Sequence, residues 1–184
     1  MKIFKRKLDN TREIIPTIYR DNRGIFYESY HVDKYRNNLN ISENFVQQNC
    51  SISSQGVLRG LHFQKKFPQG KLVRVTKGKI FDVIVDLRSS SKTFCQWDGI
   101  YLDDVERNQF WIPKGFAHGF ISLSQDSEVE YMCTDIYHPD DEMCLTWNDE
   151  DLKIEWPATD PIISEKDQNG ITLKEIIKSK FVYD

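Results

Sequence analysis

The chain has no long hydrophobic run and no segment typical of an export signal. No stretch approaches the roughly 18 apolar residues that span a bilayer, and the charged start at residues 1–7 is not followed by an apolar segment. A linker rich in proline, glycine or serine is also missing from the 184 residues. We therefore expect a single cytoplasmic domain over residues 1–184 that makes no membrane contact.

Paired cysteines and an excess of positive charge are also lacking. The four cysteines, Cys50, Cys95, Cys133 and Cys144, are widely spaced and form no CxxC pair. This spacing favours reduced, mostly buried thiols over a disulfide framework or a zinc site. The 25 lysines and arginines are scattered among 28 acidic residues, for a net charge of -3. We expect no nucleic-acid partner, and any anionic ligand to be small and locally bound.

What the chain does contain is a series of short segments in which apolar and polar residues alternate. This period of two, bounded by turn residues, predicts strands over residues 45–51, 57–64, 72–76, 80–87, 94–102, 109–112, 119–123 and 129–134. Helical periodicity is convincing only over residues 32–39 and 173–178. The pattern predicts an all-β sandwich or barrel such as a jelly roll, because closure of this kind removes exposed sheet edges.

Two of the four histidines lie in strand-like motifs that contain glycine. His62 belongs to the sequence GLHFQ at residues 60–64, and His118 to GFAHGF at residues 115–120. Imidazole has an ordinary pKa of about 6.5, so it takes up and releases protons near neutral pH. The polar residues Gln47, Asn49 and Gln64 occupy strands in which hydrophobic residues would serve a core better. The pattern predicts a proton-handling pocket; the alternative for either histidine is a satisfied core residue.

The position of Arg59 raises a question of geometry. Arg59 and His62 differ by three positions, so a regular strand would direct their side chains to opposite faces. Two explanations remain open. Either Gly60 bends the strand, or Arg59 serves a second surface such as a partner subunit's site.

A metal site is the main alternative for the histidines. The spacing Pro113-x-Gly115-x-x-His118 resembles the second half of the cupin signature, whose first half supplies His-x-His followed by Glu. Here Gln64 replaces the second histidine, and no acidic residue follows until Asp82. Two imidazoles without a carboxylate or a third histidine make a poor transition-metal site. We therefore expect no catalytic metal.

Eight motifs occur in order between about residues 20 and 167. They are Arg23-Gly24-x-Phe26-x-Glu28, Gln47-x-Asn49, the segments 56–64, 69–75, 82–88 and 112–120, Trp147-Asn148-Asp149 and Ser164-Glu165-Lys166-Asp167. Together they resemble the dTDP-4-dehydrorhamnose 3,5-epimerase family of isomerases. The resemblance implies a cupin-like jelly roll, or double-stranded β-helix, with short peripheral helices and no metal. The sequence departs from the expected pattern at Cys95 and at residues 143–145, which are more apolar than expected.

The resemblance implies a substrate, dTDP-4-keto-6-deoxy-D-glucose, in which the C4 ketone acidifies the C–H bonds at C3 and C5. Removal of either proton leaves an enolate. Inversion then needs a base on one face of the sugar, an acid on the other and a donating group near the C4 oxygen. By resemblance, His62 is the base, Asp167 orients it, Tyr131 is the acid and Lys71 stabilises the enolate oxygen. The implied product is dTDP-4-keto-L-rhamnose, an intermediate of dTDP-L-rhamnose biosynthesis.

The resemblance also implies substrate contacts by residues with charged, amide, imidazole or aromatic side chains: Arg23, Glu28, Gln47, Asn49, Arg59, His118, Tyr137, Glu142 and Lys166. The basic residues Arg23, Arg59 and Lys166 would bind the diphosphate. Tyr137 would stack on thymine, and it shares the parity of Tyr131 if that strand continues. We expect a homodimer and no cofactor.

Three other functions remain open. The first is a single-site epimerase that acts at C3 or C5 only, or on a related GDP- or CDP-linked 4-keto sugar. The second is a sugar-nucleotide-binding module without activity, which would be favoured if the base, its partner or the tyrosine were missing. The third is a metal-dependent cupin oxygenase or isomerase, which Gln64 argues against.

Overall fold

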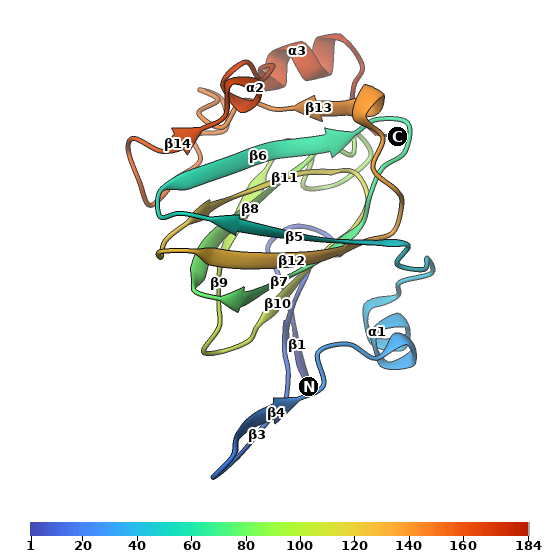
Figure 1. The fold of residues 1–184 in the computed structure, drawn as a ribbon. Coiled ribbons are helices and arrows are strands. Elements are labelled where there is room, and N and C mark those ends of the chain that lie inside the picture. The colour runs from blue at the N-terminus through green and yellow to red at the C-terminus, as the bar shows by residue number, and fades with distance from the viewer. Residues whose placement is uncertain (184) are drawn as a thin grey trace.

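Two antiparallel β-sheets packed face to face dominate the structure, a computed structural model that describes residues 1–183 (Figure 1). The short helices lie at the periphery, outside the two sheets. This arrangement is a cupin-like jelly roll, so the predicted fold class is confirmed. No helix among residues 1–183 is both long and apolar enough to cross a membrane.

The first sheet has six strands in the spatial order β1-β2-β10-β7-β12-β5. Their bounds are β1 Lys2–Lys5, β2 Arg12–Ile15, β10 Gln109–Ile112, β7 Lys71–Lys77, β12 Ser127–Cys133 and β5 Gln47–Ser53. Strand β5 forms one edge of this sheet and pairs with β12. The sheet therefore brings Asn49 and Tyr131, which are cross-strand partners, to the same place.

The second sheet has the order β13-β6-β11-β8-β9. Its bounds are β13 Glu142–Cys144, β6 Val57–Gln64, β11 Phe116–Ser122, β8 Lys79–Asp86 and β9 Trp97–Asp103, and the short β14 Ile162–Ile163 runs parallel to β6. In β11, His118 is the cross-strand partner of His62 in β6. The two predicted histidines thus lie side by side on this sheet.

The remaining elements lie outside the two sheets. Strands β3 (Ile18–Asp21) and β4 (Gly24–Tyr27) form a separate hairpin that projects from the end of the molecule opposite β6. Helix α1 spans Val32–Leu39, and a single 3₁₀ turn, η1, spans Pro139–Asp141. Helices α2 (Glu165–Gln168) and α3 (Leu173–Lys178) lie over the outer side of β6 (Figure 1). Ser164 and Thr172 cap the N-termini of α2 and α3 with their side-chain oxygens.

Three groups of buried apolar residues hold these layers together. One lies between the sheets and includes Val73, Ile84, Phe110 and Val129. A second packs β6, β8 and β11 against α3 and the segments around it, and a third packs α1 against β2, β7 and β10. Burial of apolar area on both sides of the second sheet explains why β8 is buried from Ile80 to Asp86.

Several expectations from the sequence are corrected by the structure. Strands β1 to β4, β13 and β14 were not predicted, because they have four residues or fewer and no sustained alternation. Strand β12 ends at Cys133, so Tyr137 lies in the following loop and does not continue that strand. The cysteines are free but not mostly buried, since Cys133 is buried, Cys95 and Cys144 are half-buried, and Cys50 is exposed.

Candidate active site

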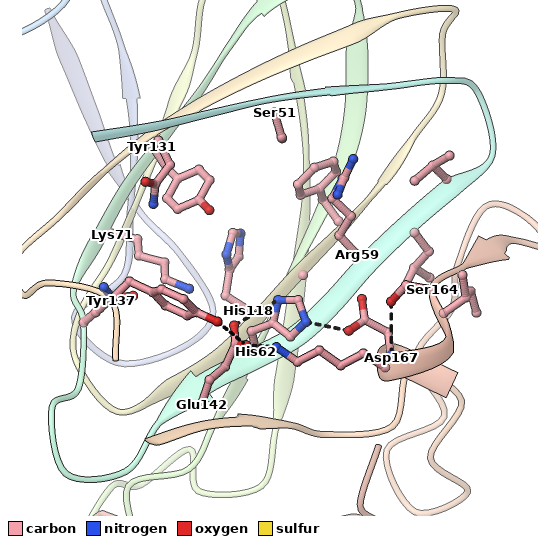
Figure 2. A pocket seen from close by; sticks show the side chains of 18 of the residues that line it. Ser51, Arg59, His62, Lys71, His118, Tyr131, Tyr137, Glu142, Ser164 and Asp167 are labelled. Carbon is pink, nitrogen blue, oxygen red and sulfur yellow. Dashed lines mark hydrogen bonds and ion pairs between the residues drawn. The ribbon is translucent and has the colours of Figure 1, made fainter. Parts of the chain in front are cut away.

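A cavity of about 620 Å³ opens between the two sheets. One wall comes from β5, β7 and β12, the other from β6 and β11, and the loop after β12, β13, β14 and α2 close one side (Figure 2). All the predicted site residues except Arg23 and Glu28 line it: Gln47, Asn49, Arg59, His62, Lys71, His118, Tyr131, Tyr137, Glu142, Lys166 and Asp167. The volume falls in the range of small-molecule sites.

His62 and Asp167 form a hydrogen-bonded pair in the cavity wall. His62 Nε2 lies 2.7 Å from Asp167 Oδ1. The other carboxylate oxygen, Oδ2, accepts the backbone N–H of Gly60 at 3.0 Å. Burial alone would raise the pKa of Asp167, but the bonds from His62 and Gly60 outweigh it and lower this pKa. An ionised Asp167 only accepts, so Nε2 carries the imidazole proton. Nδ1 lies 3.9 Å from Glu142 Oε1, beyond hydrogen-bond distance, so its lone pair can act as a base.

A β-bulge explains how Arg59 and His62 reach the same cavity. His118 pairs with His62 and Phe120 with Arg59, so three steps along β6 oppose two steps along β11. Gly60 lies in the bulge with φ of 108°. A Cβ atom there would lie 2.6 Å from the carbonyl oxygen of His118, so the position requires glycine. Of the two explanations left open, the glycine distortion within β6 is the one observed.

A second histidine pair lies deeper between the sheets. His118 Nε2 is 2.8 Å from Asp82 Oδ2, and both side chains are buried. Burial raises the pKa of Asp82 and lowers the pKa of His118, although each group partly offsets the shift of the other. The remaining oxygen, Asp82 Oδ1, is buried without a hydrogen-bond partner. Both shifts favour the uncharged forms of this pair.

Lys71 and Tyr131 lie on the wall opposite the histidines (Figure 2). The Lys71 side chain lines the cavity. Burial lowers the pKa of its amine, and nearby Cys133 and Asp82 partly oppose this shift. Its Nζ lies 5.9 Å from the centre of the Tyr131 ring. Burial raises the pKa of Tyr131, while a hydrogen bond with Asn49 partly opposes this shift. The phenol therefore remains protonated at neutral pH and can donate a proton.

Charged and polar groups line the mouth of the cavity. Tyr137 donates its hydroxyl to Glu142 Oε2 at 2.9 Å, and Lys166 forms an ion pair with the same carboxylate. The backbone N–H of Tyr137 donates to Gln47 Oε1 at 2.8 Å. Arg59 donates from Nε to the Ser53 hydroxyl. These contacts place two cationic groups and an aromatic ring around one opening.

Arg23, Glu28 and Gln64 do not line the cavity of their own chain. Arg23 pairs with Asp21 in the exposed β3–β4 hairpin, and Glu28 pairs with Lys34 of α1. Neither belongs to the cavity lining, because the hairpin extends away from the sheets. Gln64 was expected to mark the ligand pocket. Its amide nitrogen instead donates to the carbonyl oxygens of Phe67 and Ile136, and its amide oxygen accepts the backbone N–H of His138. Its role is to hold the loop that carries Tyr137.

Several lining residues were not predicted from the sequence, namely Ser51, Gln69, Ile162, Ile163 and Ser164. Ser51 shares the parity of Gln47 and Asn49 in β5, and this alternation could have found it. The pairing of Asp82 with His118 and the approach of Cys144 to Asp167 were also missed. The first depends on the pairing of β8 with β11 and the second on the packing of α2 beside β13, and the sequence carries no local signal for either.

The comparisons with known proteins agree with this geometry. The sequence profile of the dTDP-4-dehydrorhamnose 3,5-epimerase family matches residues 5–175. The chain belongs to this family. Within the epimerase family, it is 48% identical to the dTDP-4-dehydrorhamnose 3,5-epimerase of Methanothermobacter thermautotrophicus over 95% of both chains.

Two solved structures extend the comparison. The dTDP-6-deoxy-D-glucose-3,5-epimerase of Legionella pneumophila, in complex with dTDP-4-keto-L-rhamnose, superposes with a TM-score of 0.94 at 45% identity, over 99% of this chain and 97% of that one. A 3'-monoepimerase from Streptomyces bikiniensis, in complex with dTDP-quinovose, superposes with a TM-score of 0.89 at 28% identity, over 96% and 90%. The epimerase fold therefore accommodates double and single epimerases.

Proposed function

We propose that this chain is a dTDP-4-dehydrorhamnose 3,5-epimerase, an isomerase that converts dTDP-4-keto-6-deoxy-D-glucose to dTDP-4-keto-L-rhamnose. The observation that carries the proposal is that His62 on β6, paired with Asp167 of α2, lies opposite Tyr131 on β12 across one cavity. Epimerisation requires this arrangement, because the proton leaves one face of the sugar carbon and returns to the other. The relatives bearing this name support the substrate assignment.

In the proposed mechanism, neutral His62 removes the proton through Nδ1 while Asp167 holds the Nε2–H and stabilises the imidazolium that forms. The negative charge moves onto the C4 oxygen as the enolate develops. Lys71 and His118, which line the cavity from opposite sheets, supply donors for this oxygen. Tyr131 then protonates the carbon from the opposite face, and a second cycle inverts the other carbon. The chemistry needs no metal or organic cofactor.

Substrate binding follows from the charges at the cavity mouth. Arg59 and Lys166 bind the diphosphate, Gln47 and Asn49 supply amide contacts beside it, and Tyr137 stacks on the thymine. Glu142, which holds both Tyr137 and Lys166, positions these two side chains for the nucleotide. We keep the cytoplasm as the proposed compartment, in agreement with four free thiols.

The proposal includes a homodimer in which Arg23 and Glu28 enter the partner's cavity. The β3–β4 hairpin exposes aromatic side chains, with Phe26 71% and Tyr19 63% accessible, which is typical of a surface that another chain covers. Arg59 no longer supports the dimer, because the bulge directs it into the cavity of its own chain. The support comes instead from Arg23 and Glu28, which the resemblance assigns to substrate binding but which do not line the cavity of their own chain.

Incubation with dTDP-4-keto-6-deoxyglucose in D₂O, followed by NMR at C3 and C5, tests the chemistry. We expect deuterium at both carbons with inversion, and no incorporation with His62→Asn. Tyr131→Phe retains His62, so we expect exchange to continue while inversion falls. Exchange that survives in His62→Asn would overturn the assigned base. Exchange confined to one carbon would favour the alternative, a monoepimerase like the Streptomyces relative.

Mixing two inactive variants tests the shared site. If Arg23 serves the partner's cavity, a mixed dimer of His62→Asn and Arg23→Ala contains one site with both defects and one site with neither. Random reassociation should then restore about a quarter of the wild-type activity, since half of the dimers are mixed and each has one intact site. No recovery in dimers shown by native mass spectrometry to be mixed, or full activity in a monomer, would contradict the shared site.

A further inference from the structure

A cysteine lies next to the His62–Asp167 pair. Cys144 in β13 is the cross-strand partner of His62 in β6, and its Sγ lies 3.8 Å from Asp167 Oδ1. One ligating atom from each of the three side chains lies within 4.8 Å of the other two. Among residues 1–183, no other three histidine, cysteine or acidic side chains meet this condition. His62 and His118 alone make a poor metal site, but the register of β13 places a different set of ligands together.

We propose that His62, Cys144 and Asp167 form an inhibitory binding site for a zinc-like divalent cation. The inhibition rests on the proposed function, because the cation would occupy the pair assigned as the catalytic base. A thiolate, an imidazole nitrogen and a carboxylate oxygen are the three ligand types that zinc takes in proteins, and a three-ligand site leaves a fourth position open. Mg²⁺ prefers oxygen ligands in an octahedral arrangement, so this donor set selects against it.

The distances suit a tetrahedral ion after a small adjustment. Ligand atoms that bind zinc at about 2.0–2.3 Å lie roughly 3.3–3.8 Å apart. The separation of 3.8 Å between Cys144 and Asp167 already agrees with this range. The 2.7 Å between His62 and Asp167 has to open by about half an ångström.

The surroundings decide which group moves. Asp167 is fixed through Oδ2 by the N–H of Gly60, and its own N–H donates to Ser164 Oγ at 3.2 Å. His62 has more freedom, because its side chain is 28% exposed and lines the cavity. His62 and Asp167 both line the cavity, which gives the cation and a water ligand for the fourth position a path to the pair.

Proton balance explains why the bound cation inhibits. His62 donates the Nε2–H to Asp167 in the free enzyme, so coordination through Nε2 moves that proton to Nδ1. The thiol of Cys144 loses its proton to solvent and binds as the thiolate. One proton is therefore released for each cation bound. With a proton on Nδ1, His62 has no lone pair left to accept the proton of the sugar carbon, and turnover stops until the cation leaves.

Direct binding and inhibition, measured together, test the site. We expect zinc chloride to inhibit wild-type protein reversibly, with recovery on addition of a chelator, and magnesium chloride to have no effect. Cobalt(II) chloride should give a sulfur-to-metal charge-transfer band in wild-type protein. In Cys144→Ala and Cys144→Ser, the band should disappear and the inhibitory zinc concentration should rise at least about 100-fold, since loss of supporting residues alone costs 10–100-fold. Activity is compared with the metal-free value of each variant.

Cys50→Ala is the matched control, because Cys50 is an exposed thiol outside the proposed site. It should leave both the band and the zinc sensitivity of the wild type unchanged. Zinc that inhibits Cys144→Ala at the wild-type concentration, or a cobalt band that depends on Cys50, would overturn the site. The cobalt band does not require turnover. A protein that shows the band but no epimerisation would refute the proposed function and leave the metal site standing.

Discussion

The two histidine–aspartate pairs have nearly the same hydrogen-bond geometry but opposite surroundings. The bonds measure 2.7 Å for His62–Asp167 and 2.8 Å for His118–Asp82, both through Nε2. His62 is 28% exposed to the cavity, whereas His118 is 6% exposed. Asp167 has a backbone N–H on its second oxygen, whereas the second oxygen of Asp82 has no partner.

These surroundings move the two carboxyl pKa values in opposite directions. Hydrogen bonds outweigh burial at Asp167 and lower its pKa, while burial dominates at Asp82 and raises it. The pair in the cavity wall therefore keeps a charged carboxylate that supports a base. The deeper pair favours uncharged groups, which suits His118 to donate a hydrogen bond rather than to remove a proton. The environment, not the residue types, separates the two roles.

Replacing each aspartate with asparagine should give the largest difference between the two pairs, measured as the loss of kcat. In Asp167→Asn the amide can donate to Nε2, which fixes the imidazole proton on Nδ1, so we expect kcat to fall about 10³–10⁴-fold, as in the serine-protease triad. In Asp82→Asn the amide can replace an uncharged acid, and we expect a loss of no more than about tenfold. Steady-state kinetics, with circular dichroism to establish folding, measure both. Equal losses would contradict the division of roles.

Gly60 touches both pairs, so a side chain there should disturb them together. Its N–H bonds Asp167, and a Cβ would lie 2.6 Å from the carbonyl oxygen of His118. We expect Gly60→Ala to reduce the free energy of unfolding by about 2–4 kcal/mol. Gly56→Ala is the control, because Gly56 also has a positive φ, 83°, but a Cβ atom there would have no neighbour within 4 Å. We expect this variant to lose about 1 kcal/mol of unfolding free energy. Urea unfolding compares the variants, and equal losses would show that the close contact is unimportant.

The sequence predicted the parts of the fold that depend on local pattern. Strands β6 and β10 and both longer helices have the predicted bounds, because an apolar run, an alternating pattern or helical periodicity is clear there and other residue types flank each segment. Strands β1 to β4 have four residues each, and their form depends on the partner beside them. None of these four strands alternates apolar and polar residues, so the sequence carries no local pattern for them.

The residues of the candidate site were predictable where they belong to a family motif. They were not predictable where their contacts depend on how distant segments of the chain pack together. His62, Lys71, Tyr131 and Asp167 lie in one cavity as the resemblance implied. The bulge at Gly60 was one of two explanations that the sequence left open, since it depends on how β11 pairs with β6. The contacts of Asp82 and Cys144 join residues 36 and 23 positions apart, so only the folded sheets reveal them.

The pH dependence of the unfolding free energy should show the smallest difference between Asp167 and Asp82. It is also the most direct test, because it reports the charge of each carboxyl group. The lowered pKa of Asp167 contributes stability above the unfolded value of about 3.9, and that contribution is lost as pH falls through the lower folded value. The raised pKa of Asp82 has the opposite sign: its favourable contribution is present below about 3.9 and is lost as pH rises toward the folded value. His118 and Lys71, which face Asp82, reduce this shift without reversing it.

Urea unfolding between pH 3 and 6, with each asparagine variant subtracted from wild type, isolates the two contributions. The stability difference between wild type and Asp167→Asn should grow with pH, by about 1.4 kcal/mol for each unit by which the pKa differs between the two states. For Asp82→Asn the difference should shrink over the same range or change sign, because Asp82 keeps its proton in the folded protein while the unfolded chain releases it as pH rises. Slopes of the same sign would mean that both carboxylates are charged in the folded protein, and that exposure alone distinguishes the two pairs.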